Sequence, residues 1–191
     1  MKVTFFKKLL EDRNTSQWTA AQQMVYSYLL SQSILRTGGA FDKDGISIDY
    51  VELLYLRGDE KELDLCDFKV TKLATQLNLS RQNVYDCISF LQEKGYMYDD
   101  KIYCPDEIVS HGYFELKTET GLSKQMLIFY SWLVERGKDY NNLVDTYIFR
   151  LAKLFNTNDN NIKALIHRLS EKGFVRRVRD GKKGWGKLLV K

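Results

Sequence analysis

Residues Gly181 to Lys187 read GKKGWGK and contain the G-x-x-x-x-G-K pattern of loops that bind nucleotide phosphates. In those loops backbone N–H groups bind phosphate, and a Ser or Thr after the lysine holds Mg²⁺. Leu188 stands at that position, and the residues on both sides favour strands instead of the strand-to-helix turn that the loop requires. The pattern therefore predicts a glycine-rich turn whose lysines can neutralise phosphates, and it excludes an ATP site.

The charge of the chain is concentrated around this turn. Among 191 residues, 29 Lys and Arg against 25 Asp and Glu give a net charge of +4. The segment from Lys163 to Lys191 holds ten basic and two acidic residues, so it carries +8 and the rest carries −4. A basic segment on a mildly acidic chain favours a polyanionic partner. The plainer interpretation is a solvated basic face without a partner.

Other kinds of chemistry have little support in the residue types. Cys66, Cys87 and Cys104 form no C-x-x-C pair, and neither His111 nor His167 has metal-ligand spacing, so we expect no metal and no cofactor. The sequence has no G-x-S-x-G or H-E-x-x-H motif, and we do not expect an enzyme. No apolar run approaches the roughly 18 residues that span a bilayer, which favours a cytoplasmic protein.

The strongest pattern is an internal repeat. Residues 72–97 and 150–175 align without a gap at a constant offset of 78, and residues 19–30 echo 123–134 at an offset of 104. The difference between the two offsets indicates an insertion in the first copy. The identical pairs of the longer alignment are Leu73/Leu151, Ala74/Ala152, Asn78/Asn156, Asn83/Asn161, Ile88/Ile166, Leu91/Leu169 and the Glu-Lys-Gly triplets at 93–95 and 171–173.

Each copy begins with the signals of two helices. Thr19 and Ser123 are placed as N-caps, because a hydroxyl can accept hydrogen bonds from the free N–H groups of a first turn. About 14 residues with apolar side chains at helical spacing follow each cap, which predicts helices that face a core. Shorter helices are then predicted at 68–77 and 145–155.

A third helix follows in each copy. Ser80 and Asn158 are placed to cap it, and its apolar side chains recur on one face. Gly95 and Gly173 are expected to end it, because glycine tolerates the left-handed conformation that follows a helix. The short helix and the capped helix together predict a helix-turn-helix.

Two short strands are expected after each glycine, at 96–104 and 174–190. Three helices closed by a β-hairpin are typical of a winged helix-turn-helix. We therefore predict a mainly α (α+β) protein of two tandem winged helix-turn-helix modules, each with three helices and a hairpin wing. The first module is expected at 1–110, with its insertion at about 36–67, and the second at 111–191.

The segment 72–96, with the pattern L-A-x-x-L followed by S-R-x-x-V-Y and E-K-G-Y, resembles winged helix-turn-helix modules of bacterial regulators and of phage and plasmid replication proteins. Residues 5–31 look like the lead-in of the replication-type module, where a short strand precedes the first helix, and residues 113–133 repeat it. The resemblance implies binding of double-stranded DNA in replication initiation or transcriptional regulation. A mobile element, such as a phage or plasmid, is one setting that it implies for this role.

The N-terminal ends of the third helices are the predicted base-reading residues, because that end of a recognition helix enters the major groove. Arginine binds guanine O6 and N7, whereas Asn and Gln bind adenine N6 and N7. The plainer interpretation is that these polar residues are caps and surface. The candidates are Arg81, Gln82, Asn83 and Tyr85 in the first module and Asn160, Asn161 and Lys163 in the second.

The wing of the second module is the predicted phosphate contact. Its strands and turn are rich in basic residues, and its tryptophan is expected either to pack on sugar or in the minor groove, or to fold back onto the module. The candidates are Arg176, Arg177, Arg179, Lys182, Lys183, Trp185 and Lys187.

The first module differs, because Asp99 and Asp100 stand in its wing and oppose a phosphate backbone. It is expected either to read bases with little help from its wing or to bind a protein. The acidic insertion at 38–64 is a candidate dimer contact. The alternative for the whole chain is a protein-docking module of a chromosome-organising or regulatory complex, which the −4 balance outside the basic segment suits.

Overall fold

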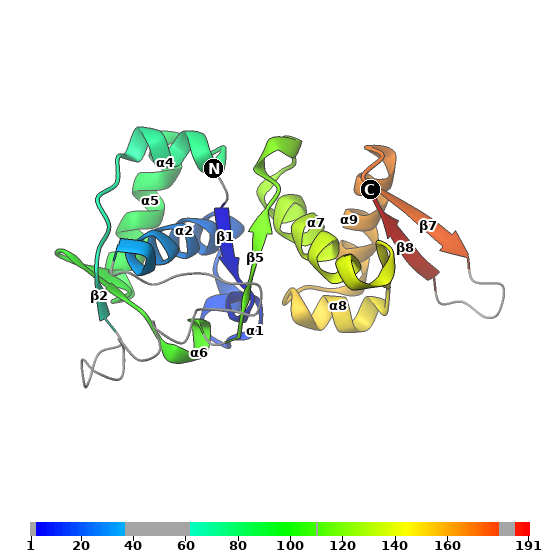
Figure 1. Cartoon of the computed structure of the whole chain (residues 1–191), viewed down its shortest axis with the longest axis horizontal. Coiled ribbons are helices and arrows are strands. Elements are labelled where there is room, and N and C mark those ends of the chain that lie inside the picture. The colour runs from blue at the N-terminus through cyan, green and yellow to red at the C-terminus, as the bar shows by residue number, and fades with distance from the viewer. Residues whose placement is uncertain (1–2, 37–61, 110, 180–185) are drawn as a thin grey trace. The chain divides into compact units, whose positions relative to one another are not determined.

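The computed structural model describes residues 3–36, 62–109, 111–179 and 186–191 (Figure 1). The protein is a mixed α+β fold in which helices predominate and the described strands form small antiparallel sheets. The chain divides into two compact units, Met1–Thr118 and Glu119–Lys191.

The first unit is built around one long helix, α2. This helix begins with a capping box, in which the Thr19 hydroxyl accepts from the N–H of Gln22 at 3.3 Å and the Gln22 side chain accepts from the N–H of Thr19 at 2.8 Å. The predicted Thr19 cap is therefore confirmed. The elements are, in chain order, β1 (Val3–Phe6), α1 (Lys8–Glu11), η1 (Thr15–Gln17), α2 (Ala20–Arg36), β2 (Glu62–Asp64), α4 (Val70–Leu77), α5 (Arg81–Glu93), β3 (Met97–Tyr98), β4 (Lys101–Tyr103), α6 (Asp106–Val109) and β5 (Tyr113–Leu116).

The second unit is built around α7, which buries an apolar face from Met126 to Leu133. Ser123 is its N-cap residue as predicted, but the Ser123 side chain makes no capping hydrogen bond. A short helix, η2 (Thr118–Thr120), leads into the unit. The other elements are α7 (Lys124–Gly137), η3 (Lys138–Tyr140), β6 (Leu143–Asp145), α8 (Ile148–Leu154), α9 (Asp159–Glu171), β7 (Val175–Arg179) and β8 (Gly186–Val190).

The two units share a set of corresponding elements. α4 and α5 begin 78 residues before α8 and α9, which is the offset of the sequence repeat. Each unit also has a three-stranded antiparallel sheet of the same order, β2-β4-β3 in the first and β6-β8-β7 in the second. The predicted hairpins β3–β4 and β7–β8 are confirmed in their strands.

The edge strands β2 and β6 were not predicted. Residue 145 was expected to begin a helix, but Leu143–Asp145 forms β6 and the helix begins at Ile148. The reason is the pairing of Val144 with Leu188 in β8, which buries Val144 to 4% exposure. A strand of three residues carries too little pattern to be seen without its partner.

In the first unit α2 is joined to the β3–β4 hairpin in the same way as α7 is joined to the β7–β8 hairpin in the second. The Tyr26 hydroxyl donates to the backbone carbonyl of Tyr103 at 2.6 Å, and Tyr130, 104 residues further on, donates to the carbonyl of Lys191. Tyr26 also packs edge-on against the ring of Tyr96, with 5.4 Å between ring centroids. Each unit therefore closes its own core with its own tyrosine.

The boundary between the units falls at Thr118 and Glu119, whereas the sequence predicted it between residues 110 and 111. The cause is β5, which pairs antiparallel with β1 from Val3↔Leu116 to Phe6↔Tyr113. The strand that was expected to open the second module thus completes the first unit.

Candidate nucleic-acid interface

The turn between α4 and α5 has the same geometry as the turn between α8 and α9. Asn78 and Asn156 take the left-handed conformation, with φ of 51° and 43°, which asparagine tolerates better than most residues. The N–H of Leu79 bonds to the carbonyl of Ala74 at 2.8 Å, and the equivalent bond from Thr157 to Ala152 measures 2.9 Å. This shared geometry places the start of α5 and the start of α9 at equivalent positions in their units.

The start of α5 carries the candidates of the first unit. The Ser80 hydroxyl accepts from the N–H of Asn83 at 3.1 Å, so the predicted cap is confirmed. Arg81 is exposed and Tyr85 is 54% exposed, so both are open to a ligand. Gln82 is also exposed, although its side-chain amide donates to the Asp86 carboxylate at 2.8 Å. The half-buried Asn83 is the least accessible of the four.

The start of α9 carries the candidates of the second unit. The Asn158 side chain accepts from the N–H of Asn161 at 2.9 Å, which confirms this cap as well. The Asn161 amide donates to the Thr157 hydroxyl at 2.8 Å and so ties the helix to the turn before it. Asn160, Asn161 and Lys163 are all exposed, but this bond engages the side chain of Asn161. Asn160 and Lys163 are therefore better placed to reach a ligand than Asn161.

The arginines of β7 do not share one surface. Arg176 pairs with Leu189 and Arg177 with Leu188, and successive side chains of a strand point to opposite faces. Leu188 is buried at 1%, so Arg177 shares the face of Leu188 and Arg176 lies on the opposite face, and both arginines are exposed. Their contact with phosphate stays a prediction.

The remaining wing candidates fall into two groups. Lys187 lies in β8 opposite Asp145 of β6, and it is half-buried, so a carboxylate stands beside it across the strands. Arg179 ends β7, whereas Lys182, Lys183 and Trp185 lie outside the described residues.

The hairpin of the first unit is short and acidic. Its strands β3 and β4 have two and three residues, and Asp99 takes a left-handed conformation with φ of 47° in the turn. The ammonium of Lys101 pairs with the Asp64 carboxylate at 2.5 Å, which engages the one lysine of this hairpin. The contrast with the second hairpin stays a prediction, because residues 180–185 lie outside the described residues. Most of the insertion proposed as a dimer contact lies outside the described residues.

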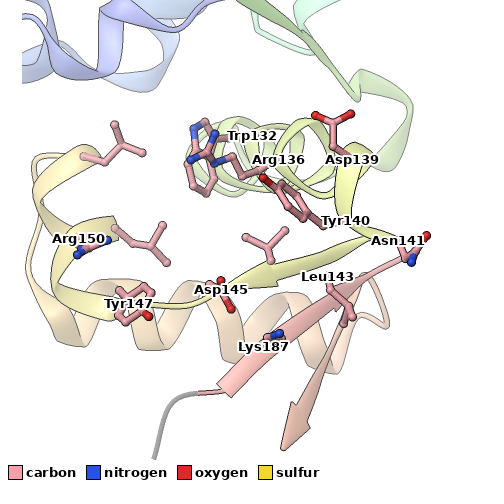
Figure 2. Close-up of a pocket in the computed structure, with 13 residues that line it drawn as sticks. Trp132, Arg136, Asp139, Tyr140, Asn141, Leu143, Asp145, Tyr147, Arg150 and Lys187 are labelled. Carbon is pink, nitrogen blue, oxygen red and sulfur yellow. The ribbon is translucent and has the colours of Figure 1, made fainter. Parts of the chain in front are cut away.

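A hollow that no sequence pattern singled out lies in the second unit (Figure 2). It has a volume of about 630 Å³ and lies between α7, η3, the edge strand β6 and the start of α8. Figure 2 shows Trp132 and Arg136 on one side and Tyr147 and Arg150 on another. The guanidinium of Arg150 lies 4.8 Å from the centroid of the Tyr147 ring.

The equivalent positions of the first unit also line a hollow, of about 700 Å³. At the helix offset of 104, Tyr28, Gln32 and Arg36 correspond to Trp132, Arg136 and Tyr140. At the offset of 78, Asp67, Lys69, Lys72 and Leu73 correspond to Asp145, Tyr147, Arg150 and Leu151. The repeat alignment therefore contained the signal for this site, but the signal is spread over two offsets.

Buried groups in the first unit stay neutral. Burial raises the pKa of the Cys66 thiol, and burial together with the nearby Cys66 raises the pKa of the Tyr28 hydroxyl. Both groups are therefore uncharged near neutral pH. Since neither adds a negative charge, the charges of this unit that a polyanion would meet come from its exposed ionised side chains.

No protein-family model matches the chain, and no curated protein or solved structure matches it either. No helix in the described part is long and apolar enough to cross a membrane. The same residues contain no group of three or more His, Cys, Asp or Glu that could hold a metal ion. The function is therefore inferred from the geometry of the chain itself.

Proposed function

We propose that the chain binds double-stranded DNA through two winged helix-turn-helix modules, one in each unit, in replication initiation or transcriptional regulation. The observation that carries the proposal is the turn that α4–α5 and α8–α9 share. In both pairs the helix after the turn, α5 or α9, has a side-chain N-cap and exposes polar side chains in its first turn. The order helix, strand, helix, helix and hairpin in each unit supports it, because this is the order of a winged helix-turn-helix.

Phosphate contacts supply most of the affinity in this proposal. The segment from Lys163 to Lys191 carries +8, and in α9 and β7 the charged side chains of Lys163, Arg176 and Arg177 are exposed. Each phosphate that a cation neutralises releases counterions from DNA, which makes binding strongly dependent on salt. The second unit is therefore the electrostatic anchor.

Base contacts supply the sequence preference. The exposed side chains best placed to enter the major groove are Arg81 and Tyr85 at the start of α5 and Asn160 and Lys163 at the start of α9. Gln82 and Asn161 are exposed too, but their amides are engaged within the chain. The first unit has a short acidic hairpin, so it is expected to depend on its helix alone. Sequence preference and affinity should accordingly respond to different substitutions.

The test is fluorescence anisotropy of the full chain on a random-sequence duplex across a salt series. The slope of log affinity against log salt should be about −3 to −6, near 0.9 for each neutralised phosphate. Because Arg176 and Arg177 face opposite sides of β7, the two single changes to Ala should differ, with one reducing the slope by about 0.9 and the other leaving it nearly unchanged. Changing Lys182 and Lys183 to Ala in addition should remove most of the slope.

The matched control changes Lys72 and Lys138 to Ala, which removes the same charge as the Lys182 and Lys183 changes, but from exposed positions outside the basic segment 163–191. This variant should keep the slope of the unchanged protein. Absence of binding at about 50 mM salt, where phosphate-driven association is strong, would contradict the proposal. An equal loss of slope in the control would show general charge attraction without a defined interface.

A further inference from the structure

The edge of the sheet in the second unit is open where the hollow lies. β6 is an edge strand of the β6-β8-β7 sheet, and its Val144 pairs with Leu188 of β8. On one side of this pair the N–H of Val190 donates to the carbonyl of Asn142, and on the other the N–H of Thr146 donates to the carbonyl of Gly186. In an antiparallel pair the bonded residues alternate with residues whose N–H and C=O groups point away from the partner strand. The backbone groups of Leu143 and Asp145 therefore point out of the sheet, at the side that β8 does not occupy.

The walls beside this edge combine apolar side chains with an excess of cations. Trp132, Leu151 and Leu154 line the hollow. Its charged lining consists of Arg136, Arg150 and Lys187 against Asp139 and Asp145 (Figure 2). The ion pairs among the described residues include neither of these arginines. An exposed edge with free backbone groups is a template for another strand, and pockets beside it select alternate side chains of that strand.

The first unit shows how the same place is closed from within the chain. There the guanidinium of Arg36 donates to the carbonyl of Leu65 at 2.8 Å, just after the edge strand β2, and lies 3.7 Å from the Asp67 carboxylate. The position equivalent to Arg36 in the second unit is Tyr140, which is 66% exposed. The second unit has thus replaced the arginine that covers the edge, while Asp145 keeps the place of Asp67.

We infer that the hollow of the second unit binds an extended acidic peptide of a partner protein, which pairs with β6 as a fourth strand of the sheet. The outward N–H and C=O groups of Leu143 and Asp145 bond to the peptide backbone. An apolar side chain of the peptide enters the pocket over Trp132, and its carboxylates pair with Arg136 and Arg150. A nucleotide would use the rings and the cations, but it has no backbone to match donors and acceptors repeated every second residue.

This inference does not depend on DNA binding. Arg136 and Arg150 are outside the set of residues proposed to contact DNA, and the peptide occupies an edge of the sheet that the β7–β8 hairpin does not use. The two proposals can therefore fail separately.

The test begins with selection of phage-displayed random decapeptides on the full-length chain. Selected peptides should be rich in Asp and Glu and should alternate them with apolar residues. Binding of a labelled selected peptide should fall at least about tenfold in Arg136→Ala and in Arg150→Ala, since each loses a charge-assisted hydrogen bond. The matched control Arg36→Ala, in the hollow of the first unit, should leave the peptide affinity unchanged.

Two further measurements separate strand pairing from simple charge attraction. Amide hydrogen exchange at Leu143 and Asp145 should slow at least about tenfold when the peptide binds, because outward N–H groups become paired. Tyr140→Arg should weaken binding by rebuilding the cover seen in the first unit, and the exposure of Tyr140 allows this change without loss of the fold, as circular dichroism would verify.

Selected peptides without an acidic preference, or peptides that leave the exchange of these two amides unchanged, would overturn the inference. Octathymidylate is the probe for the competing class of ligand. If it protects the amides of Leu143 and Asp145 and displaces the peptide, the hollow is a site for single-stranded nucleic acid and the peptide inference is wrong.

Discussion

At the scale of single residues, neighbouring asparagines at the start of α9 have separate tasks. The side chain of Asn158 accepts the N–H of Asn161 and belongs to the helix cap, whereas Asn160 is exposed and makes none of the capping contacts. Asn158, Asn160 and Asn161 therefore look alike in the sequence, although the side chains of Asn158 and Asn161 are engaged in the cap and the turn. Caps were predictable here because their chemistry is local, and the Asn161–Thr157 bond was not, because it depends on the shape of the turn.

Asn158→Ala should lower the free energy of unfolding by about 1 kcal/mol, since it removes the acceptor for a first-turn N–H. Asn160→Ala, two residues away, should change it by less than about 0.5 kcal/mol and should instead alter sequence preference on DNA. Urea denaturation followed by circular dichroism checks the first value. Equal destabilisation by both changes would mean that the cap has no special role.

Cys66 offers a prediction on pH dependence. Its pKa is raised in the folded chain, so the folded state holds the thiol proton more tightly than the unfolded state does. This stabilisation is fully present below the unfolded pKa of about 8.5 and is lost as pH rises through the folded pKa. The free energy of unfolding should thus fall as pH rises above about 8.5, and it should fall less in Cys66→Ala. An identical pH dependence in both proteins would contradict the role of this thiol.

At the scale of elements, the third helices were the easiest to predict and the edge strands the hardest. α5 and α9 combine a cap, an apolar face and a closing glycine, and Gly95 and Gly173 do take left-handed conformations, with φ of 72° and 79°. β2 and β6 have three residues each and exist because they pair with distant strands. The hollow beside β6 was missed for the same reason, since its walls come from elements that align only after the insertion is allowed for.

At the scale of the whole molecule, the division between the units depends on one pair of strands. Phe5 of β1 and Phe114 of β5 are buried at 0% and 1%, with 5.1 Å between their ring centroids. No local pattern predicts such a pair, because the two strands are separated by almost all of the first unit. The boundary at 110/111 followed from a real repeat but could not include a contact that crosses it.

A fragment of residues 1–118 should fold cooperatively, and a fragment of residues 1–110 should be several kcal/mol less stable, since loss of a buried Phe side chain alone costs about 3 to 5 kcal/mol. Thermal unfolding of the two fragments measures the difference. Phe114→Ala in the full chain is the matched change that leaves the length intact, and it should destabilise the first unit to a similar degree. Equal stability of the two fragments would show that β5 is dispensable.

The pairing of β1 with β5 also matters while the chain is being made. Phe6 leaves the ribosome long before its partner Tyr113 has been added, an interval of roughly 5 to 20 s at usual elongation rates. During that time the nascent first unit exposes an apolar strand edge of the kind that chaperones bind and that aggregates form from. Slower translation of the codons between β1 and β5 should therefore lower the soluble yield more than equal slowing after those codons.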